Sequence, residues 1–250
     1  MFVLGVIAAV LIGLSLGLLG GGGSILTVPT LHYLFGLEAH AAITTSLLVV
    51  ALTSAVALVP HVRAGSVRPR VGLVFGAASM LTAFAAAKIS HHVPPGILLV
   101  TFGALMAVAG TAMLRARPAV EVLRRDSSIG AVLGLGALAG AATGFVGAGG
   151  GFVIVPALAV VLGLPMREAI GTSLLVIAMN ATVAFGASAG TITLDLPATC
   201  AVLVAAIAGA MAGGRLATRV PAAWLRRLFG VLVIAVATAM LAIEGARLFL

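Results

Sequence analysis

The sequence carries very little charge for its length. Only 8% of its 250 residues are Asp, Glu, Lys or Arg, whereas a soluble domain carries about 25%. Hydrophobic residues make up 62% of the chain. So few charges cannot cover the surface of a soluble particle of 24.7 kDa. The composition therefore excludes an ordinary globular protein and predicts a protein of the lipid bilayer.

Several chemical signatures are also missing. Cys200 is the only cysteine, which excludes internal disulfides and metal sites of the CxxC type. The chain has no G-x-x-x-x-G-K-[ST] motif, so it does not hydrolyse ATP itself. A G-x-x-G-x-G pattern at Gly144–Gly149 lacks a preceding strand and a following acid, so it is not a dinucleotide site. With no Ser–His–Asp set and no metal-ligand cluster, we expect neither an enzyme nor a cofactor or metal.

Long apolar runs dominate what is present. A membrane-spanning helix needs about 20 apolar residues, with a range of about 17 to 25. The runs do not alternate as the strands of a transmembrane barrel would, so helices are the expected structure. The charge-free runs considered as spans are 1–19, 41–60, 71–87, 96–114, 129–146, 169–189, 196–214 and 228–243.

The chain is an internal repeat. At an offset of 127 residues, Gly17–Val49 aligns with Gly144–Val176 without a gap, and 16 of the 33 positions are identical. The same offset relates Lys88–Leu114 to Arg215–Leu241. We therefore predict a duplication, with a first repeat at 1–114, a charged cytoplasmic linker at 115–128 and a second repeat at 129–250.

Charge decides how the two repeats are oriented. Each glycine cluster is followed by a short apolar piece, which either continues the helix after a kink or turns back. With kinks, the 14 Lys and Arg residues divide 8 and 6 between the two membrane sides; with pieces that turn back, they divide 12 and 2. Positive residues stay on the cytoplasmic side, so we predict inverted repeats. The excess of Arg then follows from topology, and a nucleic-acid role is unnecessary.

The glycine clusters are the first candidate site. Each Gly in a helix costs about 1 kcal/mol relative to Ala, so consecutive glycines should break it. Pro29, six residues after Gly23, and Pro156, five residues after Gly151, predict short or bent half-helices. Free backbone N–H groups at such breaks favour an anion, and paired interruptions in inverted halves point to a transporter site. The residues assigned to this site are Gly20, Gly21, Gly22, Gly23, Ser24, Gly147, Gly149, Gly150 and Gly151.

Other glycines have a simpler interpretation. Gly13 and Gly17, and likewise Gly136, Gly140 and Gly144, stand four residues apart. This spacing is typical of glycines that let membrane helices pack closely.

Hydroxyl and amide side chains follow each cluster. Thr45 with Ser46, and Thr172 with Ser173, begin the next helix of each repeat and can donate to a ligand or cap the helix. Asn180 lies two turns further on, either as a site residue or as an interhelical hydrogen bond. His32 is the ionisable group of the first half-helix, a candidate for a proton or anion contact, and its counterpart is Ala159. No Asp or Glu occupies the middle of a span, which disfavours a cation pathway.

These motifs resemble the TauE/SafE sulfite-exporter family. Three motifs carry the resemblance. The first is the glycine cluster followed by Ser24, Val28-Pro29 and the TTSL segment at 44–47. The second is its repeat, which ends in the GTSL segment at 171–174, and the third is His61-x-Arg63-x-Gly65. It implies a prokaryotic cytoplasmic-membrane permease that exports small sulfur-containing anions such as sulfite or sulfonates. The second copy lacks the His-x-Arg pair near 187–191. The plainest role of His61 and Arg63 is then to anchor the cytoplasmic side.

We therefore expect an all-α, multi-pass integral membrane protein of about eight long transmembrane helices and two glycine-broken half-helices. Its expected function is secondary export of small anions. By resemblance to the family, the expected substrates are sulfite or organosulfonates. A passive anion channel and a non-transporting structural subunit remain alternatives. The expected partners are the lipid bilayer and a small anionic substrate, with no nucleic acid, and a homodimer is left open.

Overall fold

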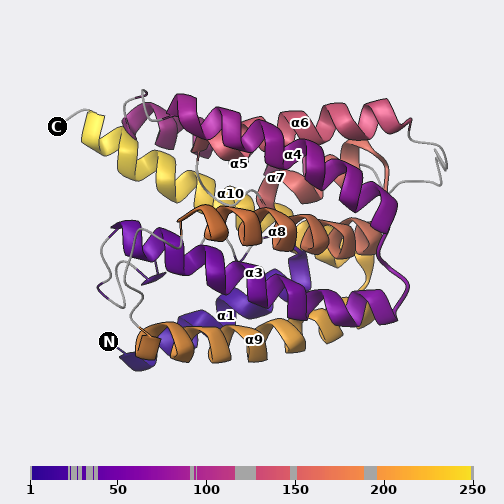
Figure 1. The fold of residues 1–250 in the computed structure, drawn as a ribbon, viewed down its shortest axis with the longest axis horizontal. Coiled ribbons are helices and arrows are strands. Elements are labelled where there is room, and N and C mark those ends of the chain that lie inside the picture. Colours follow the sequence, from indigo (N-terminus) through magenta and orange to yellow (C-terminus); the bar gives the residue numbers. More distant parts are fainter. Residues whose placement is uncertain are drawn as a thin grey trace.

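The computed structural model has only helices among its described regular elements (Figure 1). The described residues are 2–21, 23, 27, 30–31, 36, 39–90, 93, 95–115, 128–146, 151–188 and 196–248. In the first half the helices are α1 (Phe2–Leu19), α3 (Ala39–Arg63), α4 (Pro69–Ser90) and α5 (Pro95–Arg115). In the second half they are α6 (Ile129–Val146), α7 (Gly151–Pro156), the π-helix η2 (Ala157–Val161), α8 (Met166–Ser188), α9 (Leu196–Arg219) and α10 (Ala222–Leu248).

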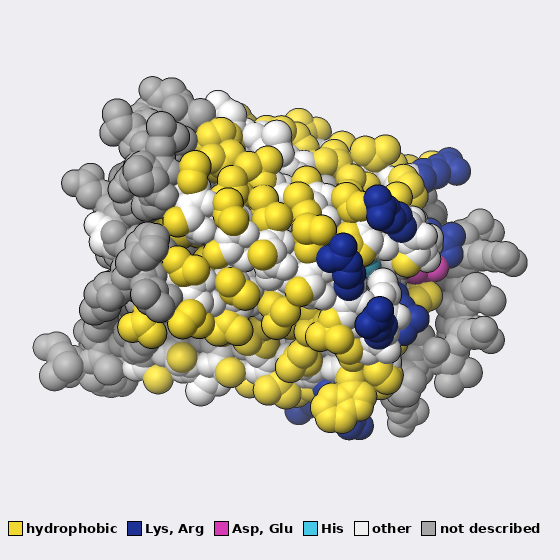
Figure 2. Space-filling model, turned by 90° about the horizontal axis from the view of Figure 1, so that it is seen from below, with side chains coloured by type: hydrophobic (Ala, Val, Ile, Leu, Met, Phe, Trp, Pro, Cys, Tyr) yellow, Lys and Arg dark blue, Asp and Glu magenta, His cyan; other side chains and the backbone are white. Residues whose placement is uncertain are grey.

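The surface of this bundle is suited to lipid. Large apolar side chains stand exposed along the helices, among them Leu81 on α4, Leu138 on α6 and Val204 on α9. Figure 2 shows such side chains covering the middle of one face, with basic side chains gathered at one end. Exposed apolar area on this scale is unfavourable in water and favourable in a bilayer, so the chain is a polytopic membrane protein.

Five described helices are long and apolar enough to span a membrane. They cover Thr44–Arg63, Pro69–Ala86, Met166–Gly186, Thr199–Arg219 and Ala222–Ala242. The expected spans at 1–19, 96–114 and 129–146 correspond to shorter apolar stretches, Leu4–Leu19, Val100–Arg115 and Ile129–Gly144. The helices that contain these stretches are longer: α1, α5 and α6 have 18, 21 and 18 residues. At 1.5 Å rise per residue they cover about 27 to 32 Å, close to the hydrocarbon core of about 30 Å.

The helices pair across the two halves of the chain. α1 packs against α9 and α6 packs against α4, while α3 packs on α8 and α5 on α10. In terms of the 127-residue offset, α6, α8, α9 and α10 are the counterparts of α1, α3, α4 and α5. The first helix of each copy, α1 or α6, therefore packs on the third long helix of the other copy, α9 or α4. The remaining two pairs, α3 with α8 and α5 with α10, join counterpart helices.

Glycines make the α1–α9 and α4–α6 interfaces close. A Cβ at Gly13 or Gly17 of α1 would overlap the backbone of Ala206 or Ala210 in α9. On α6, a Cβ at Gly136 would lie 2.6 Å from the Phe75 carbonyl oxygen. A Cβ at Gly140 would overlap Ser79 in the same way. The predicted packing role of these glycines is confirmed, since backbones in lipid approach this closely only over small residues.

The helix directions follow from these contacts. Along α4 and α6, Phe75, Ser79 and Ala83 meet Gly136, Gly140 and Gly144 in the same order, so the two helices run parallel. α8 begins beside the turn that ends α3, so α3 and α8 run antiparallel (Figure 1). Counterpart helices of the two halves thus point in opposite directions. α3 and α9 end beside the start of α8, and α5 ends beside the start of α10, so Arg63, Arg115 and Arg219 stand at one end of the bundle. This end is called the basic end, and Figure 2 shows basic side chains gathered at one end of the molecule.

Candidate functional site

The first glycine break ends α1. Gly20 N–H donates to the Leu16 carbonyl at 2.8 Å, and Gly20 then takes a φ of +73°. This left-handed conformation is open to glycine at no steric cost and commonly terminates a helix. Three residues on, a Cβ at Gly23 would overlap the carbonyl of Ile12 and lie 2.8 Å from the Leu16 Cβ. The chain after the break has therefore turned back onto α1.

The second break leads into a short arm. α7 begins at Gly151 and ends at Pro156, which has no N–H to continue the α-helical bonds. A π turn follows, with Leu162 N–H donating to the Ala157 carbonyl at 3.0 Å. Phe152 anchors the arm through an edge-to-face contact with Phe102 of α5, at 5.0 Å between ring centroids. Since α6 leaves the basic end and α8 begins there, the arm formed by α7 and η2 returns to that end (Figure 1).

The two breaks meet in the interior. A Cβ at Gly151 would lie 2.6 Å from the Gly21 Cα, and a Cβ at Gly21 would overlap the Gly151 carbonyl oxygen. Both residues are buried. The backbones of residues 130 positions apart thus touch without side chains between them, and any larger residue at either position would push the two breaks apart.

Ser173 joins the first break to the second repeat. Its hydroxyl lies 2.8 Å from the Gly20 carbonyl oxygen and 2.8 Å from the Ile170 carbonyl oxygen, and the residue is completely buried. A serine hydroxyl has one proton to donate. In this conformation that proton is committed to one of the two carbonyls. The predicted hydroxyl motif of one copy therefore contacts the predicted glycine cluster of the other.

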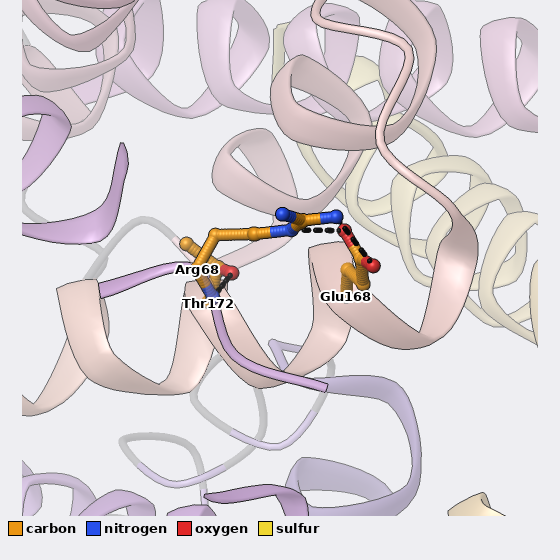
Figure 3. Close-up of polar contacts among 3 residues, drawn as sticks. All are labelled: Arg68, Glu168 and Thr172. Carbon is orange, nitrogen blue, oxygen red and sulfur yellow. Dashed lines mark hydrogen bonds and ion pairs between the residues drawn. The ribbon is translucent and has the colours of Figure 1, made fainter. Parts of the chain in front are cut away.

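Thr172 is held by the turn between α3 and α4. Figure 3 shows Arg68 beside both Thr172 and Glu168. The Arg68 backbone N–H donates to Thr172 Oγ1 at 3.0 Å. Its guanidinium pairs with both carboxylate oxygens of Glu168, at 2.7 and 3.0 Å. The hydrogen bond to Glu168 and its negative charge raise the pKa of Arg68, so the guanidinium stays charged.

His61 is more than a surface anchor. The residue is 1% exposed, with Nε2 at 3.3 Å from the Gly17 carbonyl oxygen and Nδ1 at 3.3 Å from Ser66 Oγ. It thereby links the last turn of α3 to the end of α1, just before the glycine break. Sequence reasoning missed this burial, because His61 and Arg63 stand together at the end of their helix and nothing in that segment distinguishes a buried histidine from a basic anchor. Arg63, two residues on, is exposed, as expected of an anchor.

The remaining predicted residues divide into two groups. Thr45 and Ser46 are buried at the start of α3, as their counterparts are on α8. Asn180 donates from Nδ2 to Ser79 Oγ of α4 at 3.0 Å, the interhelical bond that was one of its two interpretations. The predicted site residues outside the described part of the chain are Gly22, Ser24, His32, Gly147, Gly149 and Gly150. Among described residues, no group of three His, Cys, Asp or Glu side chains is placed to hold a metal.

Comparison with known proteins agrees with this architecture. Residues 5–240 match the family described as "Sulfite exporter TauE/SafE". The chain belongs to this family. It is 40% identical over 237 residues to a "Probable membrane transporter protein" of Xylella fastidiosa, covering 91% of this chain and 90% of that one.

More distant relatives span other prokaryotes. A protein of Bacillus subtilis with the same description, YdhB, is 29% identical over 220 residues, covering 84% of this chain and 88% of its own. A probable membrane transporter of Methanocaldococcus jannaschii is 25% identical over 181 residues, or 70% of this chain and 67% of its own. This member of the TauE/SafE family is accordingly a multi-pass membrane transporter.

Proposed function

We propose that the protein is a secondary transporter that exports small anions, with sulfite or an organosulfonate as the substrate class. The observation that carries this is the meeting of the two glycine breaks at Gly21 and Gly151, next to Gly20, whose carbonyl contacts the buried hydroxyl of Ser173. Such a junction offers uncharged donors and no carboxylate, which suits an anion. The sulfur-containing substrate class comes from the family alone.

The proposed binding mode uses backbone and hydroxyl donors. The first N–H groups of a helix have no partner within it, and the arm from Gly151 begins at the junction. Thr45, Ser46, Thr172 and Ser173 would add hydroxyl donors from the two copies. Because the Ser173 proton is committed to Gly20 or Ile170 in the present packing, an arriving anion would replace one of these carbonyls. Substrate binding would thereby loosen the contact between the first break and α8.

The proposed cycle follows from opposite helix directions in the two halves. We assign the repeats to 1–114 and 129–250, joined by a cytoplasmic linker at 115–128, with eight crossings and two arms. Inverted halves can exchange conformations by rocking about a fixed midplane site. The basic end would face the cytoplasm of a prokaryotic cell, since arginines stay on that side.

Flux from liposomes tests the proposal. Purified protein is reconstituted, and efflux of labelled sulfite is measured with and without a pH gradient, in competition with thiosulfate, sulfoacetate and chloride. Gradient-dependent efflux that only sulfur anions inhibit is expected. Gradient-independent flux blocked equally by chloride would instead establish an anion channel. No flux of any tested anion would overturn the proposed function and leave the fold standing.

A further inference from the structure

A buried histidine stands at the end of α1. His61, in the last turn of α3, is 1% exposed, and its Nε2 lies 3.3 Å from the Gly17 carbonyl oxygen. Gly17 is in the last turn of α1, where the helix carbonyls carry a partial negative charge that favours a cation. A carbonyl only accepts hydrogen bonds, so Nε2 carries a proton in this contact. The other nitrogen, Nδ1, then decides whether the ring is neutral or charged.

Ser66 can serve both charge states of the ring. Its Oγ lies 3.3 Å from His61 Nδ1 and 3.0 Å from the His61 carbonyl oxygen, and a hydroxyl has one proton to donate. When that proton goes to Nδ1, the ring is neutral. When it goes to the carbonyl, Ser66 Oγ can accept from a protonated Nδ1, and the ring is an imidazolium with both of its protons bonded. Rotation of one hydroxyl therefore lets the ring gain or lose a proton while the heavy atoms stay in place.

The partners of the ring are uncharged. Among the described side chains at this end of α3, α4, α8 and α9, Glu168 is the only acid, and both of its carboxylate oxygens pair with Arg68. α1 has no ionisable side chain. The imidazolium would therefore be stabilised by the end of α1 and by Ser66. The other charged side chains at this end of these helices are Arg63, Arg70, Arg167, Arg215 and Arg219.

The histidine lies next to the first glycine break. Three residues beyond Gly17, α1 breaks at Gly20, whose carbonyl is bonded to Ser173 Oγ of α8. On the other side of the ring, a Cβ at Gly171 of α8 would lie 3.2 Å from the His61 Cβ. His61 thus lies between the end of α1 and the first turns of α8. Because a charged donor makes a stronger hydrogen bond than a neutral one, protonation of His61 would tighten its hold on the end of α1.

We propose that His61 is a proton-binding site and that its proton is coupled to anion transport. The proposal deepens the proposed function and rests on it for the transport readout. Protonation puts a buried positive charge against the last turn of α1, beside the break, and so favours binding of an anion there. By reciprocity, the bound anion favours binding of the proton. The site belongs to one copy only, since the counterpart of His61 is Ser188.

The pH dependence of transport tests the coupling. Sulfoacetate is the anion, because both of its acidic groups stay ionised between about pH 6 and about pH 8, and the pH is equal on the two sides of the liposome membrane. In the wild type, the half-saturating sulfoacetate concentration should rise about fivefold or more over this range. His61→Gln keeps a donor for the Gly17 carbonyl but binds no proton, so it should abolish the rise. Arg63→Gln is the matched control, because it removes an exposed charge at the same helix end and should preserve the rise.

NMR measures proton binding directly, without transport. The purified protein is prepared with isotope-labelled histidine, and the ring signals that are missing from His61→Gln are assigned to His61. These signals should change from those of a neutral ring to those of an imidazolium between about pH 8 and about pH 5, where histidine titrates. Addition of sulfoacetate should alter the pH at which they change, because the two sites are coupled.

The outcomes separate the proton site from the transport function. A ring that stays neutral down to about pH 5, or wild-type pH dependence in His61→Gln, would overturn the proposal, as would pH-independent transport by the wild type. If the wild type carries no anion, the proposed function fails, and NMR still decides whether His61 binds a proton. If His61→Gln does not fold, Ser66→Ala replaces it. That variant should alter the titration of the ring, and an unchanged titration would exclude the exchange between Ser66 and Nδ1.

Discussion

Glycines do two different things in two regions of this molecule. At the α1–α9 and α4–α6 interfaces, Gly13 and Gly140 lie inside helices and let backbones of neighbouring helices touch. At the junction, Gly20 and Gly21 end a helix, and Gly151 begins one. The first group is required because no side chain fits between packed helices. The second group is required because the chain reverses direction at the junction and the backbones of the two breaks meet there.

The two groups of glycines should affect the protein differently. Packing glycines should control whether the protein assembles, whereas junction glycines should control whether the assembled protein transports. Both regions use the same residue type, so composition alone does not distinguish them. Substitutions in the two regions should therefore separate effects on folding from effects on anion flux.

The largest effect is expected at a packing glycine. Gly140→Val puts a branched side chain where even a Cβ would overlap the Ser79 carbonyl, so α4 and α6 must separate. Overpacking of this kind costs about 1–3 kcal/mol or more. Detergent-solubilised protein should lose its monodisperse profile in size-exclusion chromatography or melt well below the wild type. Gly134→Ala on the same helix has open space around its Cβ and should behave as wild type.

A junction glycine should affect flux more than folding. Gly151→Ala places a Cβ 2.6 Å from the Gly21 Cα, so the two breaks must move apart by a fraction of an ångström to an ångström. We expect at least about a tenfold loss of anion flux, because a displacement of this size weakens the hydrogen bonds from the junction to the anion. Because the overlap also lowers stability, flux is compared at equal amounts of folded, monodisperse protein. Normal flux from folded Gly151→Ala would show that the junction is packing only.

The Ser173 hydroxyl should contribute less. Ser173→Ala removes the bond to the Gly20 carbonyl and leaves that acceptor buried, at a cost of about 1 kcal/mol in stability. If the hydroxyl also binds the anion, flux at low substrate concentration should fall about fivefold. Liposome efflux measured across substrate concentrations checks this. Val183→Ala on the lipid-facing side of α8 serves as the matched control.

The smallest effect is expected at Asn180. Its amide bonds to Ser79 across α8 and α4, and such bonds between membrane helices average about 0.6 kcal/mol. Asn180→Leu should therefore lower stability slightly and leave flux within about twofold. Thermal melting and efflux of the same preparation measure both. A large, selective loss of flux would instead make Asn180 a site residue and move it from the packing region to the junction.

Much of this architecture could be predicted before the structure. The spans were expected from charge-free runs, and five of them are long apolar helices in the structure. The break at Gly20 and the short arm after Gly151 follow from runs of glycine with a proline five or six residues further on. These are local effects, in which a residue's own conformational freedom or missing N–H decides what its segment does.

The contacts of the site could not be predicted in the same way. Gly20 meets Ser173 across 153 positions, Arg68 meets Glu168 across 100 and His61 meets Gly17 across 44. None of these residues carries a local signal for its partner. His61 in particular is indistinguishable, within its own segment, from a basic residue that anchors the membrane surface.

The sequence by itself determined that this chain lies in a membrane, that two of its stretches recur at an offset of 127 residues, and that its first helix breaks at a run of glycines. These features depend on composition and on local backbone preferences. Only the tertiary structure decided which glycines pack and which form the junction. It also decided that the 61–68 turn of one repeat holds Thr172 of the other. Such contacts depend on how whole helices pack, and close packing is a property of the assembled interior rather than of any segment within it.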